Sequence, residues 1–137
     1  MEHERTGGAG AETAAAERGD LPGGREALAR LRGFGGDRLV RDMAALFVAD
    51  MPARLARARA GLLAADAAAV GYAAHTMKSS AAQFGATALA GLCGEAERAA
   101  RVGDLAALPP LVDGMARELD GFRGWLEREL RAGLEGR

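Results

Sequence analysis

Apolar residues recur at steps of three and four along most of the chain, which is the spacing of the buried face of a helix. Four segments carry such a stripe: residues 37–65, 66–84, 87–102 and 109–131. No stretch alternates convincingly with period two, so no strand is predicted. Long amphipathic helices joined by short turns predict an all-α, antiparallel up-down four-helix bundle over residues 25–131.

The two ends of the chain, a short N-terminal helix and the region of Pro52 are predicted to depart from the regular bundle. Residues 1–24 are rich in Gly, Ala and Glu and read as a flexible leader, and residues 132–137 as a frayed tail. A short extra helix is expected over residues 25–32, and Gly33, Gly35 and Gly36 are expected to interrupt it. We expect Pro52 to kink or break the helix that contains it, and Trp125 to lie at the edge of the last helix.

The turns on either side of residues 66–84 are predicted from their end residues. Asp66 is suited to cap the helix that starts there, and Gly85 to end it in the left-handed conformation. Because both connections are very short, consecutive helices should be antiparallel neighbours.

Composition and net charge argue against nucleic-acid binding, a membrane span and secretion. The formal net charge of −1 gives no basic field for nucleic acid, and no apolar run is long enough to cross a membrane. The N-terminus lacks the apolar core of a secretory signal. A single cysteine, Cys93, excludes an internal disulfide and fits a reducing compartment. A cytoplasmic monomer is the expectation.

His75 lies off the apolar stripe of its helix, so its imidazole is predicted to face outwards. An exposed histidine is ordinarily a solvated side chain, but this one has a nearby lysine and, as the turn geometry predicts, a nearby carboxylate. Lys78, one turn along, is the only lysine among 18 basic residues. A sequence that uses arginine everywhere else keeps the compact ammonium here, which suggests that the smaller cation matters.

A carboxylate is expected beside His75. If the chain reverses near residues 85 and 86, His75 stands level with Ala96, so Glu95 and Glu97 flank it on the neighbouring helix. One of them could accept a hydrogen bond from imidazole Nδ1 and leave Nε2 as the nucleophile. We favour Glu97, while Glu95 reads as a solvated acid.

Other chemistries lack support. A metal site needs several converging ligands, and the predicted bundle has one histidine and one cysteine. A serine hydrolase needs a pocket and an oxyanion site, which Ser79 and Ser80 on a convex helix do not provide. No glycine loop is followed by the lysine of a nucleotide-binding motif. We therefore expect no metal and no cofactor.

The region around His75 resembles the signature of histidine-containing phosphotransfer (HPt) domains. Residues 74–86 read AHTMKSSAAQFGA, matching that family's pattern of His, any residue, an apolar residue, Lys, Gly or Ser, five residues and Gly. Residues 89–97, LAGLCGEAE, look like the family's following helix. The resemblance spans roughly residues 24–131. Ser79 stands where many members carry Gly, and Met77 where Leu is usual.

The resemblance implies that His75 accepts a phosphoryl group from a receiver-domain phospho-aspartate and passes it to another receiver aspartate. Lys78 would then balance the phosphoryl charge, and the receiver would supply Mg²⁺. The implied partners are response-regulator receiver domains and a hybrid sensor histidine kinase. Small or exposed residues would leave room for the receiver: Gly71, Ala74, Ser79, Ala82 and Gln83.

The sequence is compatible with three functional interpretations. The leading one is a phosphocarrier of a multistep phosphorelay, which is not itself an enzyme. The alternatives are a receiver-docking adaptor that carries no phosphate, and a phosphoacceptor domain detached from a larger hybrid or chemotaxis kinase. An autonomous kinase or hydrolase has the least support, because nothing in the sequence binds ATP.

Overall fold

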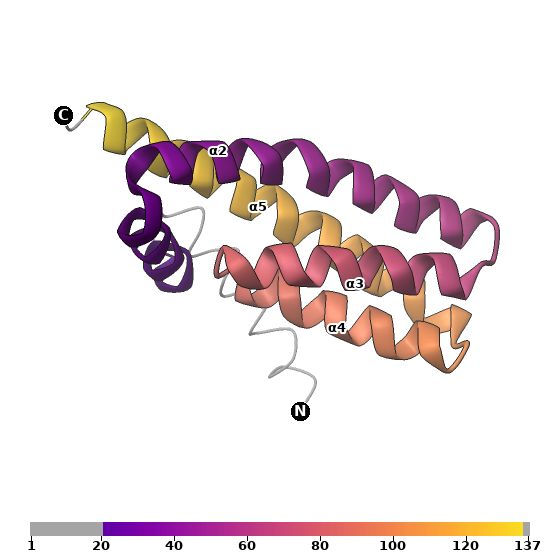
Figure 1. The fold of residues 1–137 in the computed structure, drawn as a ribbon. Coiled ribbons are helices and arrows are strands. Elements are labelled where there is room, and N and C mark those ends of the chain that lie inside the picture. Colours follow the sequence, from indigo (N-terminus) through magenta and orange to yellow (C-terminus); the bar gives the residue numbers. More distant parts are fainter. Residues whose placement is uncertain (1–20, 136–137) are drawn as a thin grey trace.

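The computed structural model describes residues 21–135, which form helices and turns and contain no strand (Figure 1). The elements are α2 (Pro22–Leu63), α3 (Ala67–Gln83), α4 (Thr87–Arg101), a short 3-10 helix η1 (Leu105–Ala107) and α5 (Leu108–Glu135). The all-α prediction is thereby confirmed. Most of the predicted leader, residues 1–20, and the last two residues of the predicted tail lie outside the described residues. Within residues 21–135, no helix is both long enough and apolar enough to span a bilayer.

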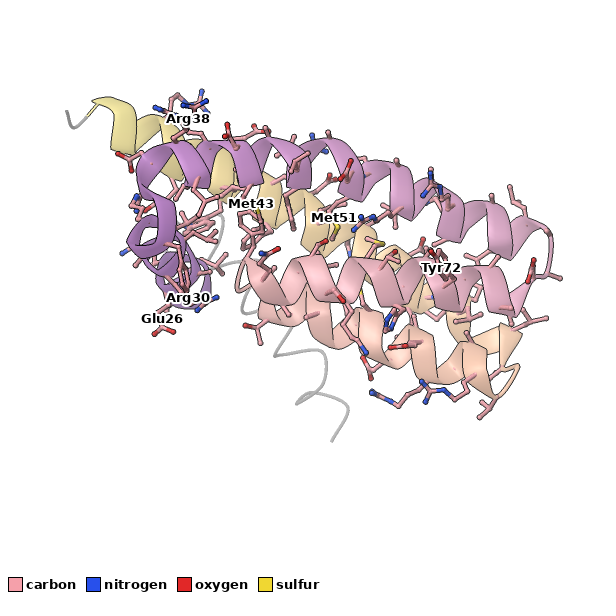
Figure 2. The ribbon with its side chains drawn as sticks, in the orientation of Figure 1. Glu26, Arg30, Arg38, Met43, Met51 and Tyr72 are labelled. Atoms are coloured by element: carbon pink, nitrogen blue, oxygen red, sulfur yellow. The ribbon has the colours of Figure 1, made fainter. Side chains whose placement is uncertain are left out.

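The four long helices pack side by side around one core. Helix α3 contacts α2 and α4, and α5 contacts α4 and α2, so the contacts close into a ring. In Figure 1 the α2–α3 turn and the α4–α5 connection lie at one end, and the α3–α4 turn lies at the other. The apolar stripes explain this packing, because each stripe faces the shared interior. Figure 2 shows Met43 and Met51 extending from α2 toward the other helices.

Aromatic rings gather at the end of the bundle near the α3–α4 turn. Phe47 lies 4.8 Å from Phe84 and 5.5 Å from Phe122 between ring centroids, and Phe122 lies 5.4 Å from Trp125. All four side chains are at most 3% exposed. These tilted and edge-on ring pairs add packing energy to what burial alone provides.

The irregularity in α2 occurs at glycines and not at Pro52. The helix continues through Pro52, so the predicted break there is wrong, whereas Gly35 and Gly36 leave helical geometry, which confirms the interruption predicted from the glycine cluster. Gly36 has φ +69°, a conformation that side chains with a Cβ adopt only at a cost. A helical segment therefore precedes the break, beginning at Pro22 and not at the expected residue 25. Pro22 suits a first helical position because its missing N–H needs no partner there.

Trp125 is completely buried, so its predicted place at the edge of the bundle is wrong. The segment before the Gly35–Gly36 break explains the difference. Gly24 lies against the indole so closely that an added Cβ would collide with two of its ring carbons. Gly24, assigned to the leader from composition, therefore covers a core tryptophan.

The turns around α3 follow their predicted chemistry. The Asp66 side chain accepts a hydrogen bond from the Ala69 N–H at 3.1 Å, the arrangement of an N-cap. Gly85 has φ +71°, and the Ala86 N–H bonds back to the Ala81 carbonyl. Together these two turns fix where α3 begins and ends, and hence which residues of α4 stand beside it.

Candidate functional site

Helix α3 has a buried face and an open face. Val70, Ala74 and Met77 are completely buried, while the side chain of His75 is 58% exposed. An imidazole in the middle of the helix is therefore open to solvent, and no neighbouring helix encloses it.

Glu97 of α4 links His75 and Lys78. His75 Nδ1 lies 2.7 Å from Glu97 Oε2, and Lys78 Nζ donates to Glu97 Oε1 at 2.5 Å. The carboxylate accepts only, so the pairing requires a proton on Nδ1. In the neutral ring this leaves Nε2 with its lone pair, and Nε2 has no hydrogen-bond partner within residues 21–135.

The charge on Glu97 is stabilised by its neighbours. The hydrogen bond from Lys78, followed by that from His75, lowers the pKa of the Glu97 carboxyl below its ordinary value. Arg101, one turn along α4, brings Nη2 to 3.8 Å from Glu97 Oε2. Arg101 was not predicted from the sequence, although its spacing of four from Glu97 is the signal of a helical ion pair.

Close packing of α3 against α4 brings these side chains within reach. A Cβ added to Gly71 would stand 2.9 Å from the Cβ of Ala100, so the bare glycine permits the approach. Further along, Gly94 leaves the side of α4 open next to the aliphatic stem of Lys78. Of the two acids proposed from sequence, Glu97 makes the contact with His75, and Glu95 does not.

The residues expected to face a partner fall into two groups. Ser79, Ala82 and Gln83 are exposed on the same helix as His75, as that expectation requires. Ala74 is fully buried and belongs to the core, so its assignment to the partner surface is wrong. Its position on the apolar stripe already placed it inside. Gly71 faces α4, where its small size serves helix packing.

Cys93 lies near this cluster but belongs to the interior. It is completely buried, and burial raises the pKa of its thiol to about 12. Such a thiol is neither a ready nucleophile nor a ready metal ligand. Over residues 21–135, no three His, Cys, Asp or Glu side chains come together as a metal site.

The arrangement suits nucleophilic attack at an electrophile brought by another molecule. The reactive nitrogen faces outwards, its ring is oriented by a carboxylate, and two cations stand nearby. The site has no wall of its own, which means that a second molecule must complete it. A convex nucleophile of this kind is typical of a carrier and not of an enclosed active site.

Comparisons with known proteins agree with this geometry. The family model described as the Hpt domain matches residues 42–130. The crystal structure of histidine-containing phosphotransfer protein B (HptB) from Pseudomonas aeruginosa PAO1 is similar, with a TM-score of 0.74 and 34% sequence identity. The match covers 78% of this chain and 92% of that one. No curated protein matches the chain. The chain belongs to the Hpt domain family, whose members are phosphocarrier modules of two-component phosphorelays.

Proposed function

We propose that this protein is a histidine phosphotransfer protein in which His75 is the phosphoacceptor. The observation that carries the proposal is the exposed imidazole whose Nδ1 is held by Glu97 at 2.7 Å, with Nε2 free and Lys78 alongside. The alternation of connections between the two ends of the bundle supports the up-down antiparallel arrangement in which α3 presents this residue.

The proposed step is an in-line displacement at phosphorus. The Nε2 lone pair attacks the phosphoryl group of a receiver's aspartyl phosphate, the N–P bond forms, and the P–O bond to the aspartate breaks. The aspartate leaves as a carboxylate, so no proton is needed for the leaving group. In the onward step a carboxylate oxygen of a second receiver attacks phosphorus, and the N–P bond breaks.

Glu97 and Lys78 have separate parts in this step. Attack through Nε2 while Nδ1 keeps its proton places positive charge on the ring, and the adjacent Glu97 carboxylate stabilises that charge. Lys78 uses one N–H on Glu97 and has two others for phosphoryl oxygens. Arg101 adds positive charge near Glu97 Oε2, the carboxylate oxygen that His75 also contacts.

The partners follow from the open site. A receiver domain would bring the phosphoryl group, an acidic pocket and its own Mg²⁺, and a hybrid sensor kinase would supply the phosphate upstream. The chain itself needs no cofactor for this transfer. We propose that it acts as a cytoplasmic monomer, whose exposed α3 surface around Ser79, Ala82 and Gln83 meets the receiver.

The test is transfer of label from a ³²P-phosphorylated receiver domain to the protein. A carrier takes acid-labile, base-stable label, and His75→Ala abolishes it while the free energy of unfolding changes by no more than about 0.5 kcal/mol, because the side chain is exposed. Binding without label would indicate a docking adaptor. A labelled His75→Ala protein, or one that no longer folds, would refute the assignment of His75.

A further inference from the structure

A groove runs along the α2–α3 side of the bundle, on the flank of α3 opposite to Glu97. Its volume is about 510 Å³. Small side chains line much of it, drawn from the last two turns of α2 and the first two turns of α3: Ala60, Gly61, Ala64, Ala69 and Ala73. Because none of these reaches far from its backbone, the groove is left open and largely apolar.

Cationic groups border the groove. Arg54 and Arg57 line it from α2, and Asp66 supplies a single carboxylate that already caps α3. Arg54 is partly engaged, since Nη1 donates to Ser80 Oγ at 2.9 Å and to the Thr76 carbonyl at 3.3 Å. Arg57 makes no hydrogen bond or ion pair within residues 21–135. The groove therefore offers an uncommitted guanidinium to an anionic group.

An aromatic side chain forms another wall. Tyr72 is 71% exposed, lines the groove from α3, and has no hydrogen-bond partner within the described part of the chain. Figure 2 shows it on the side of α3 nearer α2. A large exposed aromatic beside an arginine is the composition of a contact that dominates a protein interface.

The groove lies within the area that a partner at His75 must cover. Thr76, next to His75, lines it, and Ala69 is six residues away, about 9 Å along the helix axis. A standard interface buries about 800 Å² per partner, equivalent to a disc of about 16 Å radius. A protein centred on His75 therefore reaches Arg57 and Tyr72 as well.

We infer that this groove is the specificity pocket for the receiver domain and that it holds a carboxylate side chain at Arg57 beside an apolar side chain on the alanine floor against Tyr72. The inference rests on the proposed function. The net positive rim selects an acidic contact, and the small residues admit an apolar one. The pocket determines which receivers dock, while His75, Lys78 and Glu97 carry out the transfer.

The experiment measures the rate of transfer from phosphorylated receiver domains of the same organism as a function of receiver concentration. Arg57→Glu and Tyr72→Ala are compared with the native protein. Arg59→Glu is the matched control, with the same charge change on the same helix at an exposed position outside the groove. Labelling by phosphoramidate, a small donor that needs no docking, reports the chemistry of His75 separately.

We expect Arg57→Glu to raise the half-saturating receiver concentration at least tenfold, Tyr72→Ala several-fold, and Arg59→Glu less than twofold. Phosphoramidate labelling stays at the native rate in all three. An acid-to-lysine change on the receiver that restores transfer to Arg57→Glu would identify the contacting carboxylate.

Three results would overturn the inference. The first is equal weakening by Arg57→Glu and Arg59→Glu, which would indicate general electrostatics. The second is a native dimer that Arg57→Glu dissociates in sedimentation, which would assign the groove to a second copy. The third is a native protein that takes label from phosphoramidate but from no receiver, which would remove the proposed function as well.

Discussion

The aromatic end of the bundle and the middle of α3 are built from different side chains and serve different ends. Near the α3–α4 turn, Phe47, Phe84, Phe122 and Trp125 fill the interior with large rings. Near His75 the core includes small side chains, as at Ala74 and Ala96.

The difference shows how a stable bundle can present reactive groups. Large rings concentrate buried area at one end. Small residues elsewhere let α3 and α4 approach until one carboxylate, Glu97, reaches both His75 and Lys78. The site can therefore stay exposed without weakening the fold, because little of the stability depends on it. Substitutions in the two regions should have separable effects.

The largest effect on stability is expected at Phe122. Phe122→Ala removes a ring that contacts both Phe47 and Trp125, and should lower the free energy of unfolding by about 3–5 kcal/mol. Phe34→Ala is the control, because that ring is 80% exposed and its loss should cost less than about 0.5 kcal/mol. Urea unfolding measures both. Equal losses would show that the rings do not concentrate stability as described.

A smaller effect is expected at Gly85, in the α3–α4 turn at the aromatic end. Gly85→Ala places a side chain at φ +71° and drives its Cβ into the Gly23 carbonyl, so we expect a loss of about 2–3 kcal/mol. Gly103→Ala has the same backbone strain at φ +72° with open space around it, and should lose only about 1–2 kcal/mol. Thermal unfolding of the pair isolates the contact between the N-terminal segment and the turn. If the two losses match, that contact contributes nothing.

The smallest effect is a pH dependence at Glu97. Because its pKa is lowered in the folded state, the stability that this carboxylate contributes is fully present above the ordinary carboxyl pKa of about 4.3. That contribution is lost as the pH falls through the lowered value. The difference in unfolding free energy between the native protein and Glu97→Gln should shrink as the pH falls from about 5 towards 3. A difference that stays constant or grows between about pH 5 and pH 3 would contradict the pairing with Lys78 and His75.

Much of this organisation could be predicted from the sequence, because local rules determine it. The apolar periodicity predicted the helices, and Asp66 and Gly85 predicted the turns around α3. Because the turn between α3 and α4 is short, its position determines that Glu97 of α4 lies beside His75 of α3. Ala74 shows that membership of a sequence motif does not imply exposure. It is adjacent to His75 in sequence, but it lies on the buried face of α3.

The rest depends on contacts between distant segments. No local signal shows that Gly24 covers Trp125, because the contact joins the first helical segment to the last helix. Helical packing on both sides of Pro52 outweighs the proline, so the helix does not break there, whereas the break at Gly35 and Gly36 follows the local glycine signal. The groove beside Arg57 needs two helices to form, so neither helix reveals it alone.

The most direct test of the central claim is to identify the phosphorylated ring nitrogen. NMR of ¹⁵N-histidine-labelled protein treated with phosphoramidate should show one phosphohistidine, at His75, with phosphorus on Nε2 and Nδ1 still protonated against Glu97. Phosphorus on Nδ1, or on His3 in place of His75, would contradict it.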